Sequence, residues 1–366
     1  MKFTILQEEF NKGLSIAVRM VSSKGQMAIL SNVLIEAENE GVNISATNLE
    51  LGLRVAVGGK VEQTGAIAVP AKALVEFVGT LPSGQITVEV SQERVRVMAG
   101  KYKADFSGVG ALEFPEIARF SKKDEVVALK KQLFIEAASR VAFAAATDES
   151  RPVLTGIKFN TIEKKLNITA TDGFRLSREV IEVDGELANL IIPARTVVEL
   201  SKILSEGKKE EVEMQVVSGS NQLVFLYDKY QLISRVLEGN FPDVEKIIPT
   251  DFKSEIVIDR EELLRAVRAM SIFAREANNI IKFKYTERRL VLNALGGQTG
   301  GSEVEIEADV TGEETEISFN YRYVMDFLTS VNFERVRLLL NGPLEKGVWR
   351  GEKTDSLTHL IMPVRV

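Results

Sequence analysis

Three diverged copies of one unit make up this sequence, and the repeat constrains the fold more than any other feature. The segment VNISAT at 42–47 resembles LNITAT at 166–171, and the same offset of 124 residues leads on to LVLNAL at 290–295. Each segment alternates apolar and polar residues, which is typical of a strand with one buried face. Because solenoid repeats are only about 20–50 residues long, this longer period predicts three similar domains.

A second landmark follows the first in each copy. It is a short apolar strand that leads into Pro or Asn at the start of a helix, where both residue types are favoured. The three examples are IAVPAKALVEF at 67–77, LIIPARTVVEL at 190–200 and ISFNYRYVMDF at 317–327.

A third landmark closes each unit: Phe114-Pro115, Phe241-Pro242 and, more loosely, Met362-Pro363. The stretches FPEIARFSKKDE and FPDVEKIIPTDFKSE interrupt the periodic pattern with proline and mixed charge. We therefore place the domains at 1–120, 121–245 and 246–366.

Each unit has the pattern strand, helix, three strands, helix, strands. The first helix is amphipathic in all three units; in the first unit Leu6, Phe10 and Leu14 belong to its apolar stripe. In the third unit, Asp259 and Glu262 resemble a capping box at the start of the helix. Two helices packed on antiparallel sheets, repeated three times, predict an α+β fold.

This composition offers few residues that could carry out enzymatic catalysis. There is no cysteine, and His359 is the only histidine. The sequence has no G-x-S-x-G, H-E-x-x-H or G-x-x-x-x-G-K-[ST] motif. We therefore expect a protein that is not an enzyme, with no metal and no cofactor. No apolar run approaches the roughly 20 residues that span a bilayer, so we expect no membrane partner and a cytoplasmic location.

Charged residues recur at fixed places in the second helix of each unit. A cation lies two residues after the Pro or Asn, and an anion follows four residues later. The pairs are Lys72 with Glu76, Arg195 with Glu199, and Arg322 with Asp326. One interpretation is an ion pair on a solvated face, worth about 0.2–0.5 kcal/mol. The other is a ring of cations that faces one ligand, which the threefold repetition favours.

The net charge of −6 opposes a simple nucleic-acid binder, which usually has a basic domain. Basic side chains nevertheless recur on the polar faces of the predicted helices, such as Arg265, Arg268 and Arg275 in the third unit. An uneven distribution of charge would reconcile the negative net charge with these basic residues. One face of the protein would then contact phosphates, while the rest of its surface stays negative.

Over its whole length the chain resembles the bacterial DNA polymerase sliding clamps, the beta subunits of DNA polymerase III. Four motifs, in this order and spacing, carry the resemblance. They are RPVLTG at 151–156, TATDGFRL at 169–176, GNFPD at 239–243 and IMPVR at 361–365.

The resemblance implies a head-to-tail homodimer that forms a closed ring of six domains around duplex DNA and gives the polymerase processivity. A heterologous contact that closes after two copies makes such a ring. A ring that encloses DNA stays on it because it cannot come off sideways. It therefore needs only a few cations that face the DNA, and no side chains that recognise the bases. The candidate DNA-facing residues are Lys12, Arg19, Lys72, Arg140, Arg151, Arg195, Arg265, Arg268 and Arg322.

The resemblance also implies a pocket between the second and third domains that binds short, mostly apolar peptides. Its partners would be the DNA polymerase III alpha subunit, the clamp loader, other DNA polymerases and repair proteins. The matching positions are Leu154, Thr171, Gly173, Phe174, Arg175, Leu176, Pro242, Ile247, Asn320, Tyr323, Ile361, Met362, Pro363, Val364 and Arg365.

From the residues alone, these apolar positions also fit an ordinary core. Asp172-Gly173 between two alternating runs indicates a hairpin turn, and the tail at 359–366 reads as a terminal edge strand because its proline cannot donate to a ladder. Two positions depart from the family pattern: Phe174 replaces a histidine of many relatives, and Lys246 replaces an arginine of some.

A dimer interface is predicted from alternating charge. Glu303, Glu305 and Glu307 fall on one face of a predicted strand in the third domain. The residues expected to oppose them, or to form the apolar part of the contact, are Arg94, Arg96, Lys101, Lys103, Phe106, Ile272 and Phe273. The alternative interpretation is that these charged strand residues simply face solvent and take no part in a subunit contact.

A structural protein, in which three repeated domains form a surface or adhesion array, is the rival class. The mass in solution separates the two hypotheses. A closed dimer predicts twice the chain mass of 40.5 kDa, whereas an array protein would be monomeric or open-ended.

Overall fold

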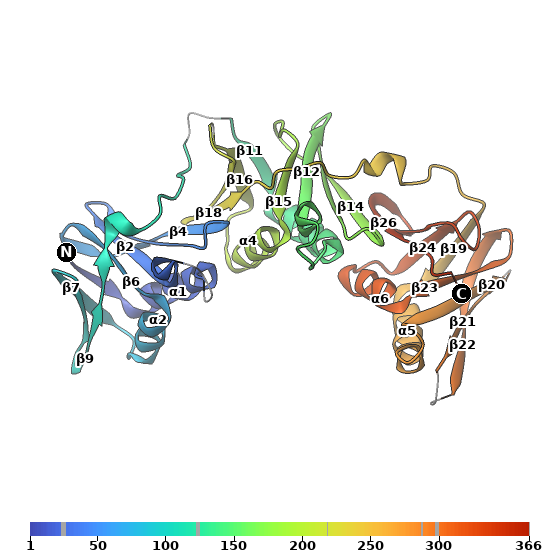
Figure 1. Ribbon diagram of the computed structural model, residues 1–366, viewed down its shortest axis with the longest axis horizontal. Helices are drawn as coiled ribbons and strands as arrows, with labels where there is room; N and C mark the ends of the chain where they lie inside the picture. The colour runs from blue at the N-terminus through green and yellow to red at the C-terminus, as the bar shows by residue number, and fades with distance from the viewer. Residues whose placement is uncertain (23–26, 122–124, 218, 287, 297–299, 366) are drawn as a thin grey trace. The chain divides into compact units, whose positions relative to one another are not determined.

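The structure is a computed structural model that describes residues 1–22, 27–121, 125–217, 219–286, 288–296 and 300–365 (Figure 1). Two helices occur in each repeat of this part of the chain. They are α1 (Gln7–Ala17), α2 (Ala71–Thr80), α3 (Lys131–Val141), α4 (Ala194–Glu206), α5 (Arg260–Ala274) and α6 (Tyr321–Ser330). No helix among the described residues is long and apolar enough to cross a membrane.

The chain divides into two compact units, Met1–Lys131 with Glu206–Val236, and Gln132–Ser205 with Leu237–Val366. The first unit holds two sheets. One has the order β5 (Lys60–Gln63), β1 (Lys2–Leu6), β7 (Gln85–Ser91), β8 (Arg94–Ala99) and β9 (Tyr102–Ser107). The other has the order β10 (Val109–Gly110), β6 (Gly65–Pro70), β2 (Asn32–Glu38), β3 (Gly41–Thr47), β4 (Leu51–Gly58), β18 (Tyr230–Arg235), β17 (Gln222–Tyr227), β16 (Glu211–Val216) and β11 (Val127–Lys130).

The second unit holds one twelve-stranded sheet, whose pairs are antiparallel like those of the first unit. Its order is β15 (Leu190–Pro193), β12 (Gly156–Ile162), β13 (Lys165–Thr171), β14 (Arg175–Glu182), β26 (Thr354–Ile361), β25 (Gly347–Gly351), β24 (Arg335–Leu340), β19 (Ser254–Asp259), β22 (Gly301–Gly312), β21 (Arg289–Leu295), β20 (Ile280–Thr286) and β23 (Thr315–Asn320).

The predicted count of three strands between the two helices is wrong. The second and third repeats have four, β12–β15 and β20–β23, and the last of each set is the apolar strand predicted to lead into the second helix. The first repeat has five, since Gly58 and Gly59, with φ of 73° and 105°, end β4 and allow β5 to pair with a different sheet.

The predicted edge strand at the C-terminus is also wrong. β26 pairs with β14 on one side and with β25 on the other, so His359 lies inside the sheet. The last paired residue is Ile361, two positions before Pro363. The proline therefore ends the strand without requiring an edge position.

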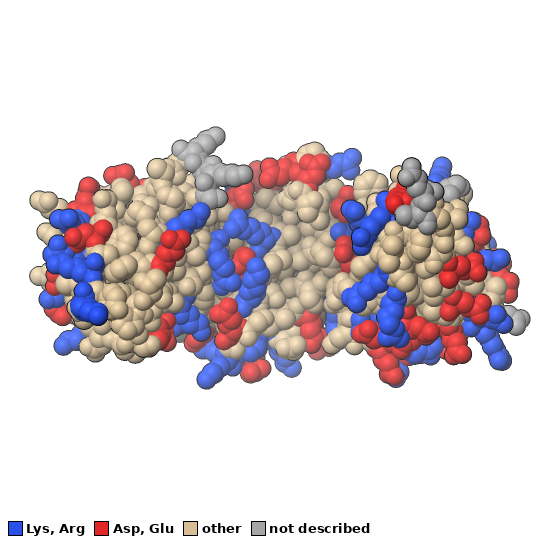
Figure 2. Space-filling view, turned by 90° about the horizontal axis from the view of Figure 1, so that it is seen from below, with Lys and Arg blue, Asp and Glu red and all other residues tan. Residues whose placement is uncertain are grey.

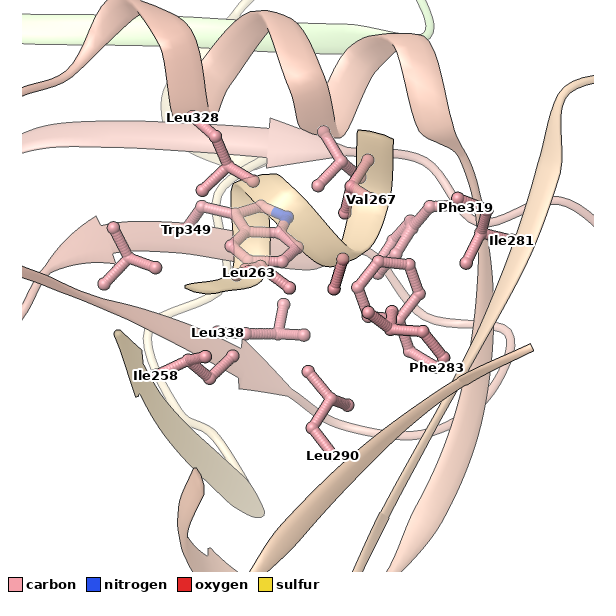
Figure 3. Close-up of a cluster of buried hydrophobic side chains, with 14 of the residues drawn as sticks. Ile258, Leu263, Val267, Ile281, Phe283, Leu290, Phe319, Leu328, Leu338 and Trp349 are labelled. Carbon is pink, nitrogen blue, oxygen red and sulfur yellow. The ribbon is translucent and has the colours of Figure 1, made fainter. Parts of the chain in front are cut away.

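Aromatic packing dominates the core of the third repeat (Figure 3). The ring of Trp349 lies 6.3 Å from Phe283, 6.0 Å from Phe319 and 5.8 Å from Phe327, measured between centroids. Leu263 and Val267 of α5 point into the same cluster, as the predicted apolar stripe requires. The helix starts at Arg260 because Oδ1 of Asp259 accepts the backbone N–H of Glu262 at 2.7 Å.

Strand pairing joins neighbouring repeats within each unit. In the first unit, β4 of repeat one pairs with β18 of repeat two. In the second unit, β14 of repeat two pairs with β26 of repeat three. The two pairings are equivalent, since Leu51 and Arg175 begin them and are 124 positions apart.

A buried charge network spans the pairing of β14 with β26. Arg140 of α3 donates to Glu179 of β14 and to Glu136, each at 3.2 Å. The hydroxyl of Ser356 on β26 donates to the same Glu179 oxygen at 3.0 Å, and the guanidinium lies 5.1 Å from the ring centre of Phe333. Arg140 is only 9% exposed. The prediction that it faces DNA is therefore wrong, because the third repeat covers that part of α3.

We predict that Arg140→Met lowers the free energy of unfolding by about 3–5 kcal/mol at neutral pH, because Glu179 is left buried without its cation. Burial already raises the pKa of Glu179, while Arg140 opposes that shift. Removing Arg140 raises the pKa further, so Glu179 takes up a proton in the folded state more readily as the pH falls below neutral, and the penalty shrinks.

The measurement is urea unfolding followed by the fluorescence of the single tryptophan, Trp349. The matched control is Arg178→Met on β14, whose partner Glu245 is 65% exposed; we expect a loss below about 1 kcal/mol. Equal losses in the two variants, or a loss at Arg140 that does not change with pH, would contradict the assignment.

Candidate functional site

A cavity of about 590 Å³ opens on the surface of the second unit. Two segments form its walls, 145–154 after α3 and the β13–β14 turn at 172–175. Four residues of the predicted pocket line it: Leu154, Gly173, Phe174 and Arg175. The other lining residues are Ala145, Ala146, Thr147, Asp148, Ser150, Arg151 and Asp172.

Side-chain hydrogen bonds hold the β13–β14 turn. Oδ1 of Asp172 accepts the backbone N–H groups of Phe174 and Arg175, both at 2.9 Å. The hydroxyl of Thr171 donates to the carbonyl of Arg175 at 2.6 Å and accepts the N–H of Gly173 at 3.1 Å. Gly173 has φ of +93°, a conformation that favours glycine. The predicted turn at Asp172-Gly173 is thus confirmed.

The same turn occurs in the first repeat, at the equivalent positions. Oδ1 of Asn48 accepts the N–H groups of Glu50 and Leu51, at 3.1 and 2.8 Å. The hydroxyl of Thr47 accepts the N–H of Leu49 at 3.0 Å and donates to the carbonyl of Leu51 at 3.2 Å. The matched pair Thr47-Asn48 and Thr171-Asp172 was the sequence signal for this shared turn, and sequence reasoning missed it.

Arg175 connects this turn to the third repeat. Its Nε donates to Asp172 at 3.0 Å, its Nη1 to Asp326 of α6 at 2.5 Å, and its Nη2 to the carbonyl of Phe143 at 2.7 Å. The guanidinium also lies 4.7 Å from the ring centre of Tyr323 on α6. One side chain therefore fixes the pocket wall against the helix of the next repeat.

The single histidine lies beneath this contact. His359 is fully buried, stacked on Phe327 at 5.1 Å between centroids and 5.3 Å from the ring of Phe143. Burial, with Arg175 nearby, lowers its pKa to about 3. Neither ring nitrogen has a hydrogen-bond partner among the described residues. A neutral, enclosed imidazole of this kind acts as a packing group.

The remaining predicted pocket residues do not line the cavity. Leu176 and Ile247 pack in a small separate apolar cluster around Val244. The backbone N–H of Met362 donates to the carbonyl of Phe174 at 2.9 Å, which places the tail beside the turn. The others are Thr171 in the turn, Ile361 at the end of β26, Asn320 and Tyr323 at the start of α6, Pro242 in the linker, and Pro363, Val364 and Arg365 in the tail.

The repeated cations of the second helices occupy equivalent positions. Lys72, Arg195 and Arg322 are each the second residue of a helix, and each is exposed. Asp326, four residues after Arg322, pairs with Arg175, and Glu199 pairs with Lys202 at 2.9 Å. The simple ion pair within one helix therefore does not account for all three copies.

The other candidate DNA-facing residues have mixed surroundings. Lys12, Arg265 and Arg268 are exposed on α1 and α5, whereas Arg19 is half-buried in the 3-10 turn Val18–Met20. Arg151 lines the cavity instead of a helix face. Basic and acidic side chains are interspersed on the face that Figure 2 shows.

The predicted interface residues of the first unit lie on β8, β9 and their turn. β9 is the edge strand of its sheet, and Lys101 and Lys103 are exposed there. Arg96 donates to Asp105 at 2.7 Å, a contact that holds the pKa of this carboxyl below its usual value, and Arg94 lies 3.4 Å from the same carboxyl. Phe106 packs edge-on against Phe77 of α2 at 5.8 Å.

The predicted interface residues of the second unit lie on β22 and α5. Glu303, Glu305 and Glu307 are exposed and alternate with Val304 and Ile306, as predicted. Along 301–307, β22 pairs only with β21 among the described residues, so this half of the strand is an open edge. Ile272 of α5 is 61% exposed, and Phe273 beside it is half-buried.

Metal-binding geometry is missing from the part of the chain that the structure describes. No group of three or more His, Asp or Glu side chains lies there in an arrangement that could hold a metal ion. Asp148 of the cavity instead accepts the backbone N–H of Ser150, and Asp172 binds Arg175.

Three family models match consecutive parts of the chain. The DNA polymerase III beta subunit N-terminal domain matches residues 1–118, the central domain residues 128–243, and the C-terminal domain residues 245–365. These matches, together with similar solved structures, confirm the predicted three-domain α+β fold.

Relatives match along the whole chain. It is 28% identical to the beta sliding clamp of Staphylococcus aureus strain Mu50, covering 100% of this chain and 99% of the relative. The DNA polymerase sliding clamp of Bacillus subtilis is 27% identical with a TM-score of 0.95, covering 100% of this chain and 99% of that one. The DNA polymerase III beta chain of Streptococcus pneumoniae is 28% identical with a TM-score of 0.93 and full coverage of both chains. The chain therefore belongs to the DNA polymerase III beta subunit family, the bacterial sliding clamps.

Proposed function

We propose that this protein is a non-catalytic processivity subunit that encircles duplex DNA as a ring-shaped homodimer and docks replication and repair proteins. Full-length similarity to sliding clamps supports the proposal. The observation that carries DNA encirclement is the exposed cation at the second position of α2, α4 and α6, one in each of the domains that we place at 1–120, 121–245 and 246–366. Phosphate contacts of this kind are independent of sequence and suit a sliding protein.

We predict retention on circular DNA and loss from linear DNA. The purified protein is incubated with a clamp loader and ATP, and its co-elution with each DNA form is measured. Encirclement predicts retention on the circle and run-off from the linear form, because only a closed circle prevents a ring from leaving.

Two outcomes would count against encirclement. Equal retention on both DNA forms would indicate ordinary binding. No retention on either form, with a loader that loads a known clamp in parallel, would favour the array hypothesis.

A second prediction concerns the three repeated cations. The triple variant Lys72→Gln, Arg195→Gln and Arg322→Gln should load on circular DNA several-fold more slowly than the parent, because three phosphate contacts per chain are lost. Its unfolding free energy should change by less than about 1 kcal/mol, since all three side chains are exposed.

The matched control removes three exposed lysines from strands, as Lys60→Gln, Lys165→Gln and Lys284→Gln, with the same change of net charge. Loading that slows equally in both triple variants would indicate a general charge effect. Normal loading in the first variant would remove these three residues from the DNA-facing set.

Charge complementarity between two open strand edges supports the homodimer. The β9 edge carries exposed Lys103, with exposed Lys101 in the turn just before it, and the 301–307 edge of β22 carries exposed Glu303 and Glu305. A strand edge with free backbone groups can pair with another chain. Since the two edges differ, the contact is head to tail and can close into a ring.

We predict that the double variant Glu303→Lys and Glu305→Lys is monomeric, because the reversed charges would face lysines across the contact. Sedimentation should then give the chain mass of 40.5 kDa, where the parent gives twice that value. The control is Glu313→Lys with Glu314→Lys, which makes the same charge change at exposed positions outside the 301–307 edge. A dimer in the first variant would reject this interface.

Partner docking rests on the cavity of the second unit. It is concave, lies against the exposed ring of Phe174, and has its wall fixed by Arg175. A pocket with apolar walls and a few fixed polar groups is the usual form of a ligand site.

A further inference from the structure

We propose that the first unit carries a second docking site, formed by Met27 and the β3–β4 turn at 47–51, which binds an apolar side chain of an extended segment from a partner protein. This second site rests on the proposed docking function and gives each chain one more place at which a partner can bind. Two observations support it: a backbone frame that both units share, and a strained leucine within that frame.

The wall of the cavity in the second unit has a counterpart in the first unit. The N–H of Leu154 donates to the carbonyl of Arg151 at 2.9 Å, and the N–H of Leu30 donates to the carbonyl of Met27 at 3.2 Å. The two pairs are 124 positions apart, which is the offset that also relates the turns. Met27 therefore stands where Arg151 stands in the pocket.

The segment that runs beside the turn is repeated as well. The N–H of Met362 donates to the carbonyl of Phe174 at 2.9 Å, and the N–H of Arg235 donates to the carbonyl of Glu50 at 2.8 Å. The turn, the wall next to it and this neighbouring segment are thus built alike in the two units. Because the frames have the same form, an extended peptide segment is the kind of ligand that suits both.

Leu49 occupies a strained position in the turn of the first unit. Its φ is +76°, which is an outlier for a bulky side chain, whereas the equivalent residue of the pocket is Gly173, with φ of +93°. The other six non-glycine residues with positive φ in the described part of the chain are Gln, Glu, Lys, Asp or Asn. A leucine here costs folding free energy that a glycine would avoid. Strain of this kind is concentrated at functional sites.

Core packing does not account for the leucine, because its side chain is 49% exposed. Met27 is 48% exposed. In the second unit, a β-carbon added at Gly173 would lie 3.9 Å from Nη1 of Arg151, so the equivalent positions place Leu49 beside Met27. These two side chains form an apolar surface, the first-unit patch, in which the flexible methionine can adapt to different ligands.

The rim of the first-unit patch is charged. Glu50 and Arg235 are both exposed and adjoin each other, at the positions that Phe174 and Met362 occupy in the second unit. An apolar centre with a polar rim is the usual form of a protein contact surface. The complementary ligand is a segment that places an apolar side chain on Leu49 while its polar neighbours lie along the rim.

A second copy of the chain is the competing occupant. The edges of β9 and β22 already offer a self-contact with complementary charges, and the first-unit patch lies on neither strand. Self-association through the patch is therefore treated as an outcome of the experiment.

The experiment selects a displayed library of random seven-residue peptides on three forms of the full-length protein. They are the parent, Phe174→Asp, which blocks the pocket of the second unit at an exposed position, and the double variant Phe174→Asp with Leu49→Gly. We expect Phe174→Asp to enrich peptides with apolar residues and the double variant to enrich none. A selected peptide should bind the double variant about tenfold more weakly than it binds Phe174→Asp.

Leu49→Gly should fold at least as well as the parent, because glycine adopts a positive φ without strain. We expect the urea concentration at half-unfolding to rise, so that lost peptide binding cannot be attributed to misfolding. A lower midpoint would show that Leu49 serves stability and would overturn the assignment.

The matched control is Leu112→Gly, which makes the same change at a fully exposed leucine of the first unit. Leu112 follows β10, the edge strand that β6 and β2 separate from β3. This variant, combined with Phe174→Asp, should bind the selected peptide as Phe174→Asp does. An equal loss of binding in the Leu112 and Leu49 variants would overturn the second site.

The outcomes separate the second site from the docking function on which it rests. No enrichment on the parent or on Phe174→Asp would overturn docking and the second site together. Enrichment on the parent that is lost on Phe174→Asp would support docking and overturn the second site. Equal enrichment on Phe174→Asp and the double variant would also overturn it. A lower mass of Leu49→Gly in sedimentation would assign the patch to self-association and overturn the peptide partner.

Discussion

The backbone pairing of β14 with β26 is the interaction on which the second unit depends. It joins two repeats into one sheet and places the turn at 172–175 beside α6 and the C-terminal tail. Arg175 begins β14, so the first pair of the ladder also positions the guanidinium that binds Asp326. Breaking this ladder would therefore separate the pocket wall from its support.

The repeat predicted much of this fold, because matching strand and helix-start segments recur at one offset. It did not give the number of strands, since the matched landmarks cover only two of the four strands between the helices of the second repeat, β13 and β15. It also misplaced the C-terminal strand. A proline near a strand is compatible with an edge position, but Pro363 lies beyond the last pair of β26, and only the pairing partners reveal this.

The candidate site was predicted through family resemblance more than through residue patterns. Alternation in TATDGFRL indicates strand and turn, yet it does not show that Leu154, seventeen positions before Thr171, lies across the cavity. Arg140 was misassigned for a related reason. Helical periodicity separates a polar face from an apolar one, but the cover that Phe333 and Asn332 provide comes from another repeat.

The distribution of charge fits retention by enclosure better than retention by affinity. A protein that held DNA by phosphate contacts alone would need many unpaired cations, and its binding would slow movement along the duplex. Here many basic side chains pair with carboxylates, as Arg140, Arg175 and Arg337 do. Exposed cations also occupy equivalent helix starts, and the ring that we propose would need only a few of them, because leaving the DNA would require opening a subunit contact.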